Sequence, residues 1–111
     1  MVEFTLVMDE FVYRGILYEL YGGILNAKQK KVYMLHNNYD LSFSEIGAEM
    51  KVTRQAAQTL FKAADLKLKK IDEELKLSQK FFEINKYAND ILTKSRDKKI
   101  ASLAKKIINL T

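Results

Sequence analysis

Hydrophobic residues recur along the chain at the three- and four-residue intervals of α-helices, most clearly between residues 41 and 64. A first short helix is predicted there by one apolar face, made of Phe43, Ile46, Gly47 and Met50. Ser42 and Glu45 form a capping box at its start, because each side chain can accept a hydrogen bond from the other residue's backbone N–H group. A second helix, capped by Thr53, is predicted by the apolar stripe Ala57, Leu60, Phe61 and Ala64.

The break between these two helices is very short. Only Lys51 and Val52 separate the first helix from Thr53. Two helices joined this tightly must cross steeply, so the pattern predicts a helix-turn-helix. The crossing is expected to bury Ile46, Gly47, Val52 and Ala57. Lys51 occupies a position where glycine is common because the residue takes a left-handed conformation, which costs a lysine roughly 1–2 kcal/mol.

The outer face of the second helix carries the candidate functional residues. Side chains that can hydrogen-bond base edges or phosphates stand opposite the apolar stripe: Thr53, Arg54, Gln55, Gln58, Thr59 and Lys62. A recognition helix uses such side chains in its first turns to contact nucleic acid. The alternative is the solvated polar face of an ordinary bundle helix, where Arg and Gln are also common.

Two further helices are predicted before the helix-turn-helix. The first runs from about residue 6 to Tyr21, with Asp9 suited to its first turn and the pair Gly22-Gly23 as its stop signal. The second follows Asn26 as N-cap and has the inner stripe Val32, Leu35 and Tyr39. An aromatic series precedes Gly22: Phe11, Tyr13, Tyr18 and Tyr21. Packing at the core edge is its expected role, and stacking on a ligand is the alternative.

The second helix of the motif is predicted to continue far beyond Phe61. A heptad seam runs along it through Phe61, Ala64, Leu68, Ile71 and Leu75. We expect this seam to pack against the chain's own C-terminal helices, and packing against a second subunit, as a homodimer, is the alternative. One C-terminal helix is predicted from Ser78 to near Thr93. The segment 97–111 is a basic amphipathic helix, for which covering the core is expected ahead of binding a partner groove or an anionic membrane.

Composition favours an all-α fold, a helical bundle in one domain over residues 1–111, with the helix-turn-helix core at about residues 27–64. The chain has no Pro, only 4 Gly, and 48% apolar residues. It has no Cys, so a disulfide framework is excluded. The acidic N-terminus is unlike a signal peptide, and no apolar run approaches the ~18 residues of a membrane span. A cytoplasmic protein is therefore expected.

Catalytic and metal-binding constellations are not found in the sequence. His36 is the only histidine, which excludes a His-based metal site or catalytic triad, and a structural role is expected for it. There is no Gly-rich phosphate loop and no evident acid–base pair. We therefore expect no enzyme activity, no cofactor and no metal.

Charge is distributed unevenly along the chain. Residues 1–50 carry four basic and seven acidic side chains, whereas residues 51–111 carry fifteen basic and seven acidic ones. The basic part begins at the turn of the helix-turn-helix. Such asymmetry indicates a polyanionic partner, with nucleic acid as the first candidate.

Several blocks of residues also indicate a family. They are Leu17-Tyr18-Glu19-Leu20-Tyr21 with Leu25, Lys28-Gln29, Tyr39-Asp40-Leu41-Ser42 with Glu45-Ile46, and Val52-Thr53-Arg54-Gln55-Ala56. With these blocks at this spacing, the stretch from Leu17 to Leu77 resembles the YlxM-like family of small bacterial helix-turn-helix proteins. The motif core is similar as well to region 4, the last DNA-binding region, of bacterial sigma factors.

The resemblance implies an all-helical cytoplasmic protein, encoded beside components of the signal recognition particle and acting as a regulator or accessory of that pathway. Its implied partners are DNA, the particle's RNA or the particle's proteins. Residues 53–56 match the start of the family's second motif helix. Positions further along depart from the bulkier and more basic residues expected there: Ala57, Gln58, Thr59 and Ala63. A helical protein-interaction module that does not bind DNA therefore stays the alternative.

Overall fold

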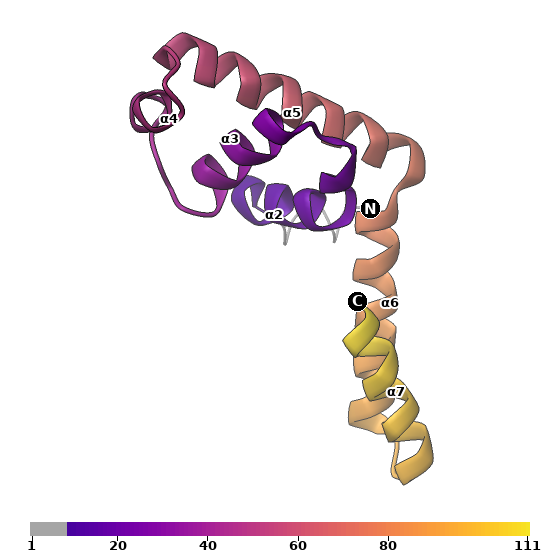
Figure 1. Ribbon diagram of the computed structural model, residues 1–111. Coiled ribbons are helices and arrows are strands. Elements are labelled where there is room, and N and C mark those ends of the chain that lie inside the picture. The colour runs from indigo at the N-terminus through magenta and orange to yellow at the C-terminus, as the bar shows by residue number, and fades with distance from the viewer. Residues whose placement is uncertain (1–8) are drawn as a thin grey trace.

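The structure is a computed structural model that describes residues 9–111. Within those residues it contains α-helices, one short 3-10 helix and no β-strand, so the all-α prediction is confirmed. The elements are α2 (Glu10–Tyr21), η1 (Gly22–Ile24), α3 (Ala27–Asn37), α4 (Phe43–Met50), α5 (Arg54–Leu75), α6 (Leu77–Lys94) and α7 (Lys98–Leu110). Figure 1 shows α2, α3 and α4 gathered along α5, while α6 and α7 extend away from them.

Side-chain caps start the helices of the bundle where the sequence indicates them. The N-caps of α2 to α5 are Asp9, Asn26, Ser42 and Thr53. Gln29 and Glu45 complete capping boxes at the starts of α3 and α4. Asp9 has an extended backbone, so α2 begins at Glu10 and not at about residue 6. The part of the predicted helix before residue 9 lies outside the described residues.

The core lies between α5 on one side and α2, α3 and α4 on the other. Its buried residues are Leu17, Tyr21, Leu25, Val32, Tyr33, Leu35, Ile46, Ala57, Phe61, Ala64 and Leu68. At the crossing of α4 and α5, Ile46, Gly47 and Ala57 are buried, as the sequence predicted, whereas Val52 is only half-buried. The core thus holds the helix-turn-helix rigidly against the two preceding helices.

The inner stripe of α3 differs from the predicted one. Tyr39 is 64% exposed, because α3 ends at Asn37 and the chain then turns through Asp40, which has a φ of 56°. The prediction of Tyr39 as a core residue is therefore wrong. Tyr33 is fully buried instead, and its ring stacks on those of Tyr18 and Phe61 with centroid distances of 5.8 and 5.0 Å.

The heptad seam of α5 packs within the chain from Phe61 to Ile71, as expected, but its partners are α2 and α3. Its last member, Leu75, is 45% exposed, so the prediction of Leu75 as part of the packed seam is wrong. The prediction that the C-terminal helices pack on the long helix is wrong. The physical reason is a sharp turn at Lys76, whose φ of 55° ends α5 and directs α6 away from the bundle. Since α7 packs chiefly on α6, it does not cover the core either.

A buried carboxylate fixes the junction between α5 and α6. Asp72 accepts hydrogen bonds from the hydroxyls of Tyr13 and Tyr21, each at 2.7 Å, and from the hydroxyl and N–H group of Ser78 at 2.5 and 3.2 Å. Burial alone would raise the pKa of Asp72, but these hydrogen bonds outweigh it and hold the pKa below its ordinary value. Burial and the bond to Asp72 raise the pKa of Tyr21 to about 12. Tyr13 and Tyr21 are thus structural residues.

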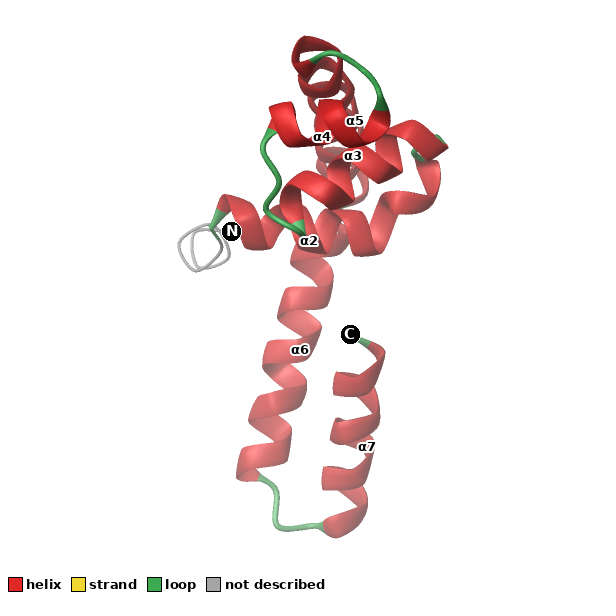
Figure 2. Ribbon diagram, turned by 60° about the vertical axis from the view of Figure 1, so that its left-hand side comes forward, coloured by secondary structure: helices red, strands yellow, loops and turns green. Residues whose placement is uncertain are grey.

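Helices α6 and α7 form an antiparallel hairpin that projects from the bundle (Figure 2). The molecule is consequently elongated, with extents of 57 × 24 × 23 Å. In the hairpin only Ser78, Ala88 and Ala104 are buried, and Ser78 belongs to the junction with α5. The bundle end of the molecule is therefore well packed, and the hairpin is thin.

Candidate nucleic-acid interface

The crossing of α4 and α5 depends on a residue without a side chain. A Cβ atom added to Gly47 would lie 2.8 Å from the carbonyl oxygen of Val52 and 3.2 Å from the backbone nitrogen of Arg54. Both neighbours are backbone atoms, which cannot rotate away as the end of a side chain can. Gly47 therefore allows α4 to approach the start of α5 closely and sets the angle at which α5 leaves the turn.

The turn itself passes through a left-handed lysine, as the sequence predicted. Lys51 has φ and ψ of 59° and 42°, and the N–H group of Val52 donates to the carbonyl of Gly47 at 2.9 Å. This is the usual way in which a helix end satisfies its last carbonyl groups. The Lys51 side chain is exposed at the turn. A cation therefore stands beside the start of α5.

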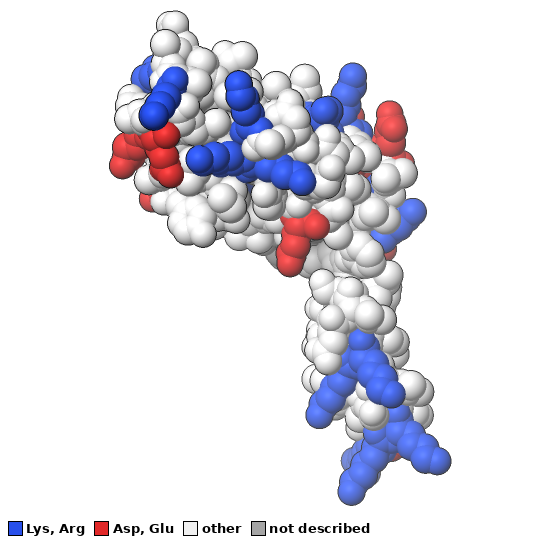
Figure 3. Space-filling model, in the orientation of Figure 1, with Lys and Arg blue, Asp and Glu red and all other residues white. Residues whose placement is uncertain are grey.

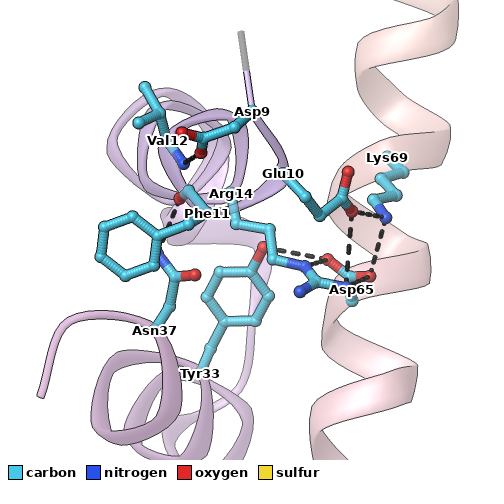
Figure 4. A network of polar contacts seen from close by, with 9 residues as sticks. All are labelled: Asp9, Glu10, Phe11, Val12, Arg14, Tyr33, Asn37, Asp65 and Lys69. Carbon is cyan, nitrogen blue, oxygen red and sulfur yellow. Dashed lines mark hydrogen bonds and ion pairs between the residues drawn. The ribbon is translucent and has the colours of Figure 1, made fainter. Parts of the chain in front are cut away.

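Polar contacts anchor α5 to the preceding helices through a second carboxylate, Asp65 (Figure 4). Arg14 donates from both Nε and Nη2 to its two oxygens, at 3.1 and 3.3 Å. The Tyr33 hydroxyl donates at 3.0 Å, and the Lys69 ammonium lies 3.1 Å from the carboxylate. Lys69 also pairs with Glu10. Three helices are thereby joined at one point.

Electrostatics keep this cluster charged. Burial opposes the ionisation of Asp65, but hydrogen bonds from Arg14 and Lys69 outweigh it and lower its pKa. Burial and the charge of Asp65 raise the pKa of Tyr33, so its hydroxyl stays a donor. The axis of α5 is thus fixed by an ion-paired network that joins it to α2 and α3.

The predicted recognition residues gather at the opposite, N-terminal end of α5. Arg54, Gln55, Thr59 and Lys62 are exposed, and Gln58 is half-buried at the edge of this face. Thr53 is exposed as well, and its hydroxyl oxygen accepts the N–H group of Ala56 at 3.0 Å. Within residues 9–111, no hydrogen bond or ion pair engages the other five side chains. We call these six residues the recognition face.

Positive charge predominates at the recognition face itself. The first turn of α5 has no acidic residue, so the positive end of the helix dipole is not neutralised there. Lys51, Arg54 and Lys62 supply the cations, whereas Glu45 and Glu49 are exposed on α4. Figure 3 shows, on one side of the molecule, basic side chains over the bundle and along the hairpin, with acidic ones mainly on the bundle. The arrangement suits an anionic ligand at the start of α5.

Comparison with known families agrees with this geometry. A family model described as "UPF0122: Putative helix-turn-helix protein, YlxM / p13 like" matches residues 8–108. The chain belongs to the UPF0122 family. The match extends through α6 and most of α7, beyond the stretch Leu17 to Leu77 on which the resemblance was first based. The C-terminal hairpin is therefore part of the UPF0122 fold.

Individual UPF0122 proteins of bacteria are similar over much of the chain. One from Clostridium botulinum is 34% identical over 91 residues, which cover 82% of this chain and 84% of the relative. One from Clostridium perfringens is 42% identical over 66 residues, covering 60% and 59%. One from Thermoanaerobacter is 30% identical over 76 residues, covering 68% and 65%. No solved structure matches the chain significantly.

Two features of the candidate interface do not stand out in the sequence. Leu66 is 64% exposed and lies four residues beyond Lys62, so it extends the recognition face by one turn. The four-residue spacing from Lys62 could have indicated it. Lys51 was considered only for its strained backbone, although its exposed side chain adds a cation at the turn.

His36 lies outside the recognition face and has a structural role in this UPF0122 chain. Its Nδ1 atom lies 2.9 Å from the Leu41 carbonyl oxygen, and its ring stacks on Phe43 with a centroid distance of 4.3 Å. Among residues 9–111, no three acidic, His or Cys side chains are grouped to hold a metal ion. In the same part of the chain, no helix has the length and apolarity needed to cross a membrane.

Proposed function

We propose that the recognition face binds duplex DNA, with the first turns of α5 in the major groove, and that the protein acts as a regulator of transcription. The observation that carries this proposal is the set of exposed side chains at the start of α5, five of which have no partner within the described residues. Elsewhere along α5 the polar side chains of Asp65, Lys69 and Asp72 are held in internal networks. The recognition face therefore combines exposed, unpartnered side chains with the N-terminus of the helix, whereas the other exposed charged residues of α5, among them Lys70, Glu73 and Glu74, lie further along it.

The side chains of the recognition face can bind both the phosphates and the base edges of DNA. Arg54 and Lys62 can neutralise phosphates or, in the case of Arg54, bind guanine with two hydrogen bonds. Gln55 can bind adenine in the same two-point manner. The attachment of α5 through Gly47 and Asp65 favours such contacts, because the helix is already ordered and loses little conformational freedom on binding.

Replacement of two recognition residues tests this proposal. Arg54→Ala with Gln55→Ala should lower the affinity for a selected duplex by about thirtyfold or more, since it removes two two-point base contacts that contribute about 1–3 kcal/mol each. Folding should be unaffected, because both side chains are exposed and unpartnered. Binding can be measured by fluorescence anisotropy, after a preferred duplex has been selected from random sequences.

The matched control is Arg96→Ala, which removes one exposed cation at the far end of the hairpin. It should lower the DNA affinity much less than the double substitution. Equal affinity of the wild type and the Arg54/Gln55 variant for the selected duplex would contradict the proposal.

A role beside the signal recognition particle rests on the family resemblance alone. In that role the same face would contact the particle's RNA or one of its proteins. Duplex RNA has a deep and narrow major groove, so contact would be through shape and phosphates and would be insensitive to base sequence. Sequence selectivity on DNA therefore separates this function from the proposed one.

A further inference from the structure

The hairpin of α6 and α7 leaves a large apolar surface uncovered. Six large residues, 38–59% exposed, make up this surface, which we call the hairpin face: Ile84, Tyr87, Ile91, Ile100, Leu103 and Ile107. Between the two helices, only Ala88 and Ala104 are almost completely buried, at 2% and 1% exposure. The other large apolar residues of the pair, including Leu92 and Ile108, are at most half-buried, so the two helices by themselves cover too little apolar surface for stability.

The six residues lie on the same side of the hairpin. Ile91 of α6 and Ile100 of α7 line one shallow hollow, together with Asp90 and Lys94. Within each helix, spacings of three and four residues keep the other members in line with these two. The hairpin face is thus continuous along both helices.

Charges of opposite sign border the two edges of the hairpin face. On α6, the residues directly before Ile84 and Ile91 are Glu83 and Asp90, and on α7, the residues directly before Ile100 and Ile107 are Lys99 and Lys106. Lys80 and Lys94 lie on the same edge of α6, about one turn before Glu83 and one turn after Asp90, so this edge is acidic only in its middle. Since Ile91 lies beside Ile100 in the antiparallel hairpin, Asp90 is nearly level with Lys99, and Glu83 with Lys106. No ion pair within the described residues engages these four side chains.

We propose that a second copy of this chain covers the hairpin face, with α6 of each copy packed against α7 of the other. A two-fold axis parallel to the hairpin produces this pairing and creates a four-helix bundle. In this arrangement Glu83 and Asp90 of each copy lie opposite Lys106 and Lys99 of the other copy, at the same heights along the bundle. Packing α6 against α6 would instead bring the acidic edges together, so charge complementarity selects the first arrangement.

The size of the hairpin face suits a stable dimer. Its six residues expose on the order of 600 Å² per copy, close to the roughly 800 Å² per partner of a standard specific interface. Burial of this surface would supply the core that the hairpin lacks. The pairing does not depend on DNA binding, but it would place both recognition faces at the same end of the four-helix bundle. Two half-sites about one turn of DNA apart, or a multiple of that, would then be expected.

The mass of the full-length protein in solution tests the pairing, by light scattering coupled to gel filtration. The wild type should have twice the 12.9 kDa of one chain. Leu103→Glu should raise the dissociation constant of the dimer by about a hundredfold or more and give single chains, because it places a charge in the centre of the apolar face. The matched control Ser102→Glu, an exposed position outside the hairpin face, should leave the dimer intact.

Charge reversal tests the arrangement of the helices and does not depend on how Leu103→Glu folds. Glu83→Lys with Asp90→Lys makes both edges basic, and Lys99→Glu with Lys106→Glu makes both edges acidic. Each variant alone should dimerise at least tenfold more weakly than the wild type, and an equimolar mixture should form a heterodimer. Wild-type protein that stays at 12.9 kDa, or a mixture that does not restore the dimer, would overturn the proposal.

Which helices face each other is decided by crosslinking, which is clean because the chain has no native cysteine. Tyr87→Cys and Leu103→Cys chains, mixed and oxidised, should give a disulfide-linked heterodimer in the proposed arrangement. Efficient crosslinking of Tyr87→Cys with itself would overturn it in favour of α6 packed on α6. DNA affinity is not used in any of these measurements, so failure here leaves the proposed function to its own test.

Discussion

Gly47 and Lys51 shape the same turn in two different ways. Gly47 contributes the absence of a side chain, which lets α4 lie against the backbone of the next helix. Lys51 contributes a left-handed backbone, which reverses the chain within two residues but is unfavourable for a lysine. The position of the recognition face thus depends on two residues that do not belong to it.

The first prediction concerns Gly47. Gly47→Ala should lower the free energy of unfolding by about 1–3 kcal/mol, because the new Cβ atom collides with the carbonyl of Val52 and the helices must move apart. The measurement is urea denaturation followed by circular dichroism. Since the displacement also shifts α5, DNA binding should weaken at temperatures where the variant is still folded.

Gly15 provides the matched control for this substitution. It lies inside α2, and a Cβ atom there would have only an ordinary contact with the Asn37 side chain, at 3.8 Å. Gly15→Ala should therefore raise stability by about 0.5–1 kcal/mol. Similar effects of the two substitutions would show that the close approach at Gly47 has no energetic importance.

At the scale of the helix, α5 is held by two carboxylates seven residues apart. Asp65 binds Arg14, Tyr33 and Lys69, and Asp72 binds two tyrosines and Ser78. Both lie on the side of α5 that faces α2. Asp65 therefore orients the middle of the helix, and Asp72 fixes the point where the hairpin departs from the bundle.

A prediction for α5 concerns Asp72, at the junction between α5 and α6. Asp72→Asn should lower the free energy of unfolding at pH 7 by about 1–3 kcal/mol, because it removes the charge that strengthens four hydrogen bonds in a buried site. Thermal or urea unfolding measures the loss. Glu73→Gln is the control at the neighbouring exposed position, and its effect should stay within about 0.5 kcal/mol.

The pH dependence of stability follows from the same carboxylate. The pKa of Asp72 is lower in the folded state than its ordinary value, so its stabilisation is complete above about pH 4 and is lost as the pH falls through the folded-state pKa. The wild type should therefore lose stability below about pH 4 more steeply than Asp72→Asn. Asp65, whose pKa is also lowered, should contribute part of the pH dependence of stability in both proteins. Parallel pH profiles would contradict the assigned role of Asp72.

Local features of these helices could be predicted from the sequence, because the interactions that create them lie within a few residues. The caps Asn26, Ser42 and Thr53 and the left-handed Lys51 are of this kind. The buried networks were not predictable in the same way. Asp65 and Asp72 are charged residues that flank a heptad seam, and only the position of α2 shows that Arg14 and Tyr13, more than fifty residues earlier, are among their partners.

In the whole molecule, the arrangement of the helices depends on which of them cover the seam of α5. Both the C-terminal helices and the N-terminal ones have apolar stripes, and the pattern alone does not choose between them. The turn at Lys76 decides the question by directing α6 and α7 away. The recognition face was predictable because exposure at the start of α5 follows from helical periodicity, whereas the projecting hairpin was not.

Binding of duplex DNA by the recognition face can be tested by a salt titration. Affinities for a selected duplex and for the signal recognition particle RNA would be measured between low and high salt, with the wild type and Arg54→Ala/Lys62→Ala. Sequence-selective DNA binding is expected. The logarithm of the affinity should fall linearly with that of the salt concentration, with a slope shallower by about 2 in the variant, one unit per lost phosphate contact. Weak and unselective binding to DNA beside firm binding to the RNA, or equal slopes for both proteins, would contradict DNA binding by the recognition face.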